Sequence, residues 1–92
     1  MLERAAVKQG TKVTFVLPED AEGDRPVSVV GDFNDWKPGA HVLKPREDGS
    51  RAVSVVLPKG RMTAFRYLAG GGHWFDEGDA DHHDGTNGYV HT

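Results

Sequence analysis

Four side chains in this sequence could together bind a ring-shaped, hydroxylated ligand. Trp36 closes the turn GDFNDW (31–36), and Trp74 follows three glycines, so both indoles are expected beside turns. Arg66 and Asn87 add a guanidinium and a carboxamide. Indole faces stack on apolar C–H surfaces, while the two polar groups form hydrogen bonds with hydroxyls. This combination suits a pyranose ring, which has an apolar C–H face and a rim of hydroxyls.

Each of these residues also has an ordinary structural interpretation. Trp36 could pack in the core as most tryptophans do, although the polar residues around it in the turn favour an exposed indole that a ligand covers. Arg66 could be a solvated strand residue, and Asn87 could serve the turn before Gly88. In the triplet 73–75 one aromatic could enter the core while another stays outside.

The composition indicates one small domain. The chain has 92 residues, with four Phe, two Tyr and two Trp, so leaving an aromatic side chain outside the core would sacrifice stability. The absence of cysteine excludes disulfides and zinc–thiolate sites. Residues 1–10 carry charges and no apolar stretch, so no signal peptide is expected, and no segment reaches the length of a membrane span. We therefore expect a cytoplasmic protein that has no membrane partner.

The charge distribution argues against nucleic acid as a partner. Residues 1–66 hold all eleven Lys and Arg against nine acidic residues, whereas residues 67–92 hold five acidic residues and no Lys or Arg. Nucleic-acid binding needs a basic surface that neutralises phosphates. The acidic end is expected to be a solvated loop.

Alternating apolar residues and turn signals predict an all-β fold. Regularly spaced short strands without helical periodicity are typical of an antiparallel sandwich, here immunoglobulin-like with about seven strands. Asp48-Gly49 predicts a hairpin, Pro45 demotes its strand to an edge, and the one helix candidate, 3–8, is too short to stand alone. Phe15, Phe33, Phe65 and Tyr67 are expected in the core. The strands are expected at 12–17, 27–33, 41–47, 51–58, 61–69, 73–75 and 88–91.

The acidic segment 76–84 resembles a metal loop only superficially. Asp79, Asp81 and His83 alternate as calcium ligands would, but Asp84 stands where the loop needs glycine and Val90 where it needs glutamate. We therefore expect no metal and no cofactor.

Catalysis is not expected either. A 92-residue sandwich has little depth for a cleft that excludes water and shifts the pKa of a carboxylic acid. The sequence contains no nucleophile elbow, phosphate loop or dinucleotide fingerprint, because glycines 70–72 lack the required pattern. No catalytic residue is therefore assigned.

The order of several motifs resembles a known family. VSVVGDFNDWKP, a following hairpin, FRYLAGGGHWFDE and GTNGYV together resemble carbohydrate-binding module family 48 over nearly the whole chain, about 11–91. That family includes the N-terminal early-set domains of isoamylases and branching enzymes, and the glycogen-binding domain of the AMP-activated protein kinase β subunit. The resemblance implies a sandwich over 11–92, preceded by an extension over 1–10.

The resemblance also implies a function and a set of site residues. It implies a non-catalytic module that binds glycogen, starch or maltooligosaccharides. Trp36 and Trp74 would stack on glucose, Arg66 and Asn87 would hydrogen-bond hydroxyls, and Thr86 lies beside Asn87. The alternative is an interaction or structural module of the same fold that docks onto a partner, such as a glucan-active enzyme, without binding sugar itself.

Overall fold

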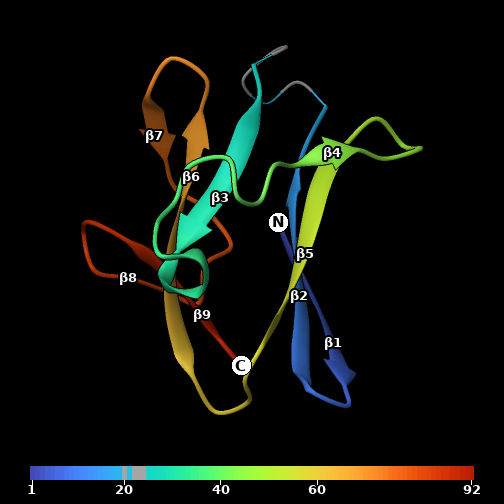
Figure 1. Ribbon diagram of the computed structural model, residues 1–92, viewed down its shortest axis with the longest axis vertical. Helices are drawn as coiled ribbons and strands as arrows, with labels where there is room; N and C mark the ends of the chain where they lie inside the picture. Colours follow the sequence, from blue (N-terminus) through green and yellow to red (C-terminus); the bar gives the residue numbers. More distant parts are fainter. Residues whose placement is uncertain (20, 22–24) are drawn as a thin grey trace.

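The protein is a sandwich of two antiparallel β-sheets, as a computed structural model that describes residues 1–19, 21 and 25–92 shows (Figure 1). The first sheet has the strand order β1-β2-β5-β4, and the second has the order β3-β6-β9-β8, with β7 also paired to β6. The expected all-β antiparallel sandwich is confirmed, and the described residues form nine strands in place of about seven. The strands are β1 (Leu2–Val7), β2 (Gly10–Leu17), β3 (Val27–Gly31), β4 (Lys44–Pro45), β5 (Arg51–Leu57), β6 (Met62–Ala69), β7 (His73–Phe75), β8 (His82–His83) and β9 (Gly88–His91).

The N-terminal segment differs from the expectation. Residues 3–8, which are too short to stand alone as a helix, are not helical, and Leu2–Val7 forms β1 and pairs with β2 along its whole length. Gly10, the first residue of β2, has φ of +150° and no room for a side chain, because a Cβ there would lie 2.2 Å from the carbonyl oxygen of Leu57 in β5. Within the segment 1–10, expected as an extension, residues 2–7 supply an edge strand of the first sheet and Gly10 begins the next strand.

The two shortest strands, the expected β4 and the additional β8, lie at sheet edges. Pro45 stands in β4, the edge strand next to β5, where its missing N–H leaves no inner hydrogen bond unmade. The predicted Asp48-Gly49 hairpin joins β4 to β5, and the Asp48 carboxylate accepts hydrogen bonds from the N–H and hydroxyl of Ser50. β8 lies in the acidic segment that was expected to be a loop, and it forms an edge of the second sheet, beside β9.

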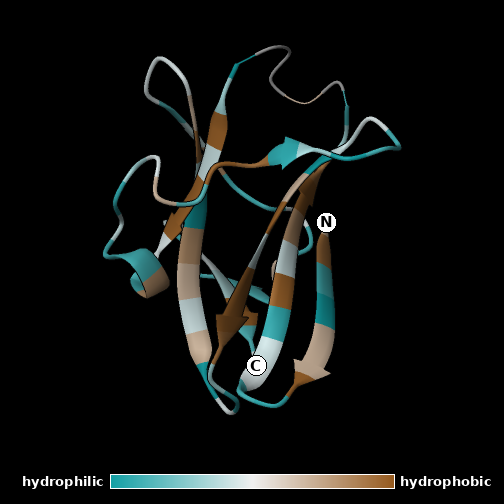
Figure 2. Ribbon diagram, turned by 45° about the vertical axis from the view of Figure 1, so that its right-hand side comes forward, coloured by the Kyte–Doolittle hydropathy of each residue, from teal (hydrophilic) through white to brown (hydrophobic). Residues whose placement is uncertain are grey.

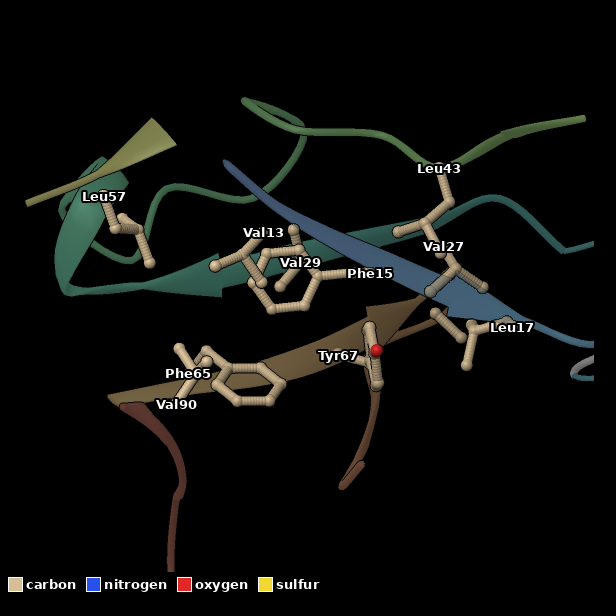
Figure 3. Close-up of a cluster of buried hydrophobic side chains, with 11 residues drawn as sticks. Val13, Phe15, Leu17, Val27, Val29, Leu43, Leu57, Phe65, Tyr67 and Val90 are labelled. Atoms are coloured by element: carbon tan, nitrogen blue, oxygen red, sulfur yellow. The ribbon is translucent and has the colours of Figure 1, made fainter. Parts of the chain in front are cut away.

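The core lies between the sheets and is built by period-two alternation. Figure 2 shows hydrophobic and hydrophilic residues alternating along the strands. Phe15 of the first sheet packs against Phe65 and Tyr67 of the second, with ring centroids 5.0 Å and 6.4 Å apart (Figure 3). These three predicted core residues are fully buried, and Phe33 packs against the cluster while remaining partly exposed.

No helix within the described residues is long and apolar enough to cross a lipid bilayer. The one helical element there is the single 3₁₀ turn η1 (Asp32–Asn34), which follows β3. Since Phe65, Tyr67 and Ala69 of β6 face the core, the alternate residues of this strand face outward, and they form the floor of the site described next.

Candidate functional site

The candidate site is the outer face of the second sheet, centred on Ala64, Arg66 and Leu68 of β6. β3 pairs with one side of β6, so Val30 stands beside Arg66. β9 and β7 pair with its other side one after the other, so Tyr89 stands beside Ala64 and Trp74 beside Leu68. These outward residues and the turn that carries Trp36 are called the platform below.

The floor of the platform is already covered by larger side chains. Val30 and Ala64 occupy outward positions on β3 and β6, yet both are buried. Small or branched apolar residues at outward positions become buried only when neighbouring side chains close over them. The large aromatic and charged side chains of the platform therefore lie over Val30 and Ala64 and form its outer surface there.

The GDFNDW turn is held in place by Asn34. Its Oδ1 accepts a hydrogen bond from the Gly31 N–H at 3.0 Å, while its Nδ2 lies 3.0 Å from both the Val29 carbonyl oxygen and the His41 Nδ1. Gly31 is required because a Cβ there would lie 2.3 Å from the Ala64 carbonyl oxygen. The polar residues of this motif thus have structural roles that fix where the following tryptophan lies.

Trp36 lies at the end of this turn and is half-buried, whereas the sequence pattern favoured an exposed indole. Asp35 and Trp36 both adopt left-handed backbone conformations, with φ of 55° and 57°, which is uncommon for residues other than glycine. The indole Nε1 donates to Asp32 Oδ1 at 3.0 Å, and Asp32 Oδ2 lies 3.4 Å from the Ala64 N–H. Through Asp32, these contacts connect the indole to Ala64 of β6, which is part of the platform.

Arg66 and Trp74 are in direct contact. The Arg66 guanidinium carbon lies 5.6 Å from the centroid of the Trp74 ring, within cation–π range. Trp74 is 41% exposed, while the next aromatic, Phe75, stacks on the buried Tyr67 at 5.2 Å. The alternation within the triplet therefore sends Trp74 to the platform and Phe75 toward the core.

The orientation of the Arg66 guanidinium is fixed by Asp76. The Arg66 Nε donates to Asp76 Oδ1 at 3.0 Å, and the His83 Nε2 lies 3.1 Å from Asp76 Oδ2. The other ring nitrogen of His83, Nδ1, accepts from the Gly85 N–H at 3.0 Å. With Nδ1 as an acceptor, Nε2 carries the proton and donates to Asp76. The chain His83–Asp76–Arg66 thus links β8 to the centre of the platform.

Thr86 and Asn87 lie in the turn between β8 and β9. Their N–H groups donate to Asp84 Oδ1 at 2.9 Å and 2.7 Å. Hydrogen bonds from the Asn87 N–H, the Tyr89 hydroxyl and the Thr86 N–H hold the pKa of Asp84 well below its usual range. Gly88 of β9 pairs with Phe65 of β6 in an antiparallel register. Asn87, which precedes Gly88, therefore lies on the Arg66 side of this pair.

The structure therefore brings the predicted site residues toward one face, but only two of them are in direct contact. Arg66 and Trp74 touch, Trp36 is connected to the same strand through Asp32, and Asn87 and Thr86 stand in the turn where β9 begins. The platform also contains residues that the sequence interpretation missed, namely Asp32, Asp76, Asp84 and Tyr89. For Tyr89 a signal existed, since Val90 fits the core pattern and its neighbour must then face outward.

A hollow of about 250 Å³ adjoins the Trp74 end of the platform. Ser28 and Leu68, which face outward from β3 and β6, form part of its lining. The rest of the lining is apolar or glycine and comes from Pro26, Val27, Pro38, Gly39, Val42 and residues 69–72. The hollow extends the platform beyond the Leu68–Trp74 row as a shallow apolar surface.

Carboxylates of the acidic segment bind other parts of the protein. The buried Glu77 accepts from the Tyr67 hydroxyl at 2.8 Å and from the Asp79 N–H at 2.9 Å. Asp81 pairs with Arg4 and accepts from the His91 N–H at 2.7 Å. Within the described ranges, no three His, Asp or Glu side chains gather as metal ligands would. These carboxylates fasten the segment to β1, β6 and β9.

Comparison with known proteins gives two partial similarities. The chain is 45% identical over 56 residues to the 1,4-alpha-glucan branching enzyme GlgB of Salinibacter ruber, a match that covers 58% of this chain and 8% of that enzyme. It is 34% identical over 73 residues to the GlgB of Aquifex aeolicus, covering 76% of this chain and 11% of that enzyme. No family model matches the chain. The chain thus spans about a tenth of the length of these relatives.

Proposed function

We propose that this protein is a non-catalytic module of the carbohydrate-binding family 48 type that binds α-glucan chains on the outer face of its second sheet. The observation that carries the proposal is the pairing of an exposed indole with a fixed guanidinium, Trp74 beside Arg66, on the same face as Trp36. The similarity to part of two α-glucan branching enzymes supports a glucan as the ligand.

The geometry suggests how a glucan chain would bind. Glucose rings would stack their C–H faces on the Trp74 and Trp36 indoles, whose contacts with Arg66 and Asp32 fix their orientation. The Arg66 Nε donates to Asp76, which fixes the plane of the guanidinium. The two terminal nitrogens are then the donors that would hydrogen-bond sugar hydroxyls. Asn87 and Thr86 would supply further polar groups at the start of β9.

The carboxylates around the platform support a binding role without catalysis. A glycosidase needs one carboxylic acid with a raised pKa beside a second carboxylate. Asp84 has a lowered pKa, and Asp76 and Asp32 are each occupied by side chains of the platform itself. These groups are arranged to hold the aromatic and polar contacts in place.

A second candidate function is docking onto a glucan-active enzyme. The specific observation is that the matched segment makes up only 8% and 11% of the two branching enzymes, so in those proteins a similar segment belongs to a much longer chain. Trp and Arg are also the side chains that dominate protein interfaces. In this alternative the same platform would face protein in place of sugar.

The deciding experiment uses two matched alanine variants. Trp74 and Val56 are 41% and 48% exposed, and Val56 lies on β5 of the other sheet. Truncating Val56 should change stability by no more than about 0.5 kcal/mol. Truncating Trp74 also removes its cation–π contact with Arg66, which contributes about 0.5–1 kcal/mol at an exposed site, so both variants should remain folded. We expect maltoheptaose to shift amide NMR signals near residues 36, 66 and 74. We expect Trp74→Ala, and not Val56→Ala, to abolish retention on amylose resin.

The dissociation constant for maltoheptaose is expected between about 1 μM and 1 mM, because an open face surrounds few ligand atoms.

Two outcomes would contradict the proposal. If millimolar maltoheptaose leaves the platform signals unchanged, glucan binding is wrong and docking onto a partner becomes the leading function. Equal retention of the two variants would place any glucan site elsewhere on the protein.

A further inference from the structure

We infer that Tyr89 is a third aromatic contact for the same ligand and that the site consequently prefers oligosaccharides long enough to reach both Trp74 and Tyr89. This inference rests on the proposed glucan function. It concerns a residue that the motif pattern did not indicate and that the strand register places on the platform.

Tyr89 and Trp74 stand in line along the same side of β6. Tyr89 is paired with Ala64 and Trp74 with Leu68, and β9 and β7 both lie on the side of β6 opposite β3. The two positions are therefore four residues apart along the strand, which corresponds to about 13–14 Å between their backbones. Arg66 lies midway. A single six-membered ring cannot span this separation, so a ligand that touches both aromatics must contain several rings.

The Tyr89 ring is held in position before any ligand arrives. Its hydroxyl donates to Asp84 Oδ2 at 2.7 Å, and its ring lies 5.5 Å from the His82 ring, tilted by 42°. Asp84 is itself fixed by two N–H groups of the turn. A side chain whose rotamer is already restricted loses little entropy on binding, and tyrosine is well suited to this role because it has only two side-chain torsions.

The chemistry of Tyr89 matches a hydroxylated ring. The side chain is half-buried on the platform, so part of the ring surface is available for stacking. Its hydroxyl hydrogen is directed to Asp84 and the Asn87 side chain hydrogen-bonds the same oxygen, so the acceptor capacity that remains on the oxygen would serve one sugar hydroxyl. Across Ala64 from Tyr89, Asp32 connects Trp36 to the same row. Ala64 thus has Tyr89 on one side and, through Asp32, Trp36 on the other.

The test compares a long and a short ligand in Tyr89→Ala and Tyr89→Phe. The Trp74 indole N–H signal in NMR reports binding at the far end of the platform. We expect Tyr89→Ala to weaken maltoheptaose about 3- to 10-fold, because one aromatic contact is lost. Maltose binding at Trp74 should stay within about twofold, because a disaccharide there does not reach Tyr89. Tyr89→Phe should keep most of the affinity, because the ring remains.

Contrary outcomes separate this inference from the proposed function. If the wild-type protein binds maltoheptaose and Tyr89→Ala binds it equally well, Tyr89 is not a contact, although the glucan function stands. Equal weakening of maltose and maltoheptaose would show a general disturbance of β9 and also overturn the inference. In the unmodified protein, nuclear Overhauser effects between the Tyr89 ring and maltoheptaose are expected, and their absence in a bound complex would contradict a direct contact. If the wild type binds neither sugar, the proposed function itself fails.

Discussion

Replacing Asn34 with alanine tests whether the GDFNDW turn is positioned by its polar residues. The carboxamide makes three contacts of 3.0 Å, with the Gly31 N–H, the Val29 carbonyl and the His41 ring. Each hydrogen bond of this kind contributes about 0.5–1.5 kcal/mol to stability. Asn34 is partly exposed, so water can replace some of what is lost, and we expect the variant to lose about 2–3 kcal/mol.

The effect is measured by thermal unfolding followed by circular dichroism. For a domain of this size each kcal/mol lowers the midpoint by about 4–8 °C, so Asn34→Ala should melt roughly 8–24 °C below the wild type. Asp35→Asn is the matched control, because Asp35 is exposed on the same turn and asparagine tolerates its left-handed backbone. The control should melt close to the wild type. A midpoint for Asn34→Ala within about 3 °C of the wild type, less than 1 kcal/mol, would refute this account of the turn.

Two further predictions concern protonation and ions. Burial, reinforced by Glu77, raises the pKa of Tyr67, and the hydrogen bond to Asp84 raises the pKa of Tyr89. At about pH 10 the denatured chain is about half ionised at tyrosine, so the native protein should show less tyrosinate absorbance than the denatured chain. Because the two tyrosine pKa values are raised in the folded protein, the stability they confer is present below the pKa of unfolded tyrosine and is lost as the pH rises through the pKa values of the folded state. Tyrosine that is half ionised in the native protein at about pH 10 would contradict these contacts. Glucan affinity should be unchanged by metal chelators and by moderate salt, because the ligand is neutral and forms no ion pair with the protein that salt could screen, and the proposed contacts include no metal. A loss of affinity in chelator would instead indicate a metal-dependent site in segment 76–84.

The fold class could be predicted from the sequence because strand alternation is a local property. Phe65 and Tyr67 flank Arg66, and the period of two sends the first two inward and the third outward regardless of the rest of the chain. The Asp48-Gly49 hairpin was equally local. The first strand could not be predicted in this way, since residues 2–7 show no alternation and become a strand only through pairing with β2.

The sequence by itself determined which side chains were available for the site, and only the tertiary structure decided how they meet. The contact of Arg66 with Trp74 depends on the register of β6 with β7, which the turn through Gly71 and Gly72 sets with φ values of 88° and 83°. The half-burial of Trp36 depends on two left-handed residues and on Asp32, and neither backbone angles nor cross-strand hydrogen bonds are visible in residue order. Tyr89 joins the platform because Ala64, 25 positions earlier in the chain, is its partner across the sheet. Such distant pairings are fixed when the two sheets bury their common core, because a slip of one residue would turn every inward side chain outward.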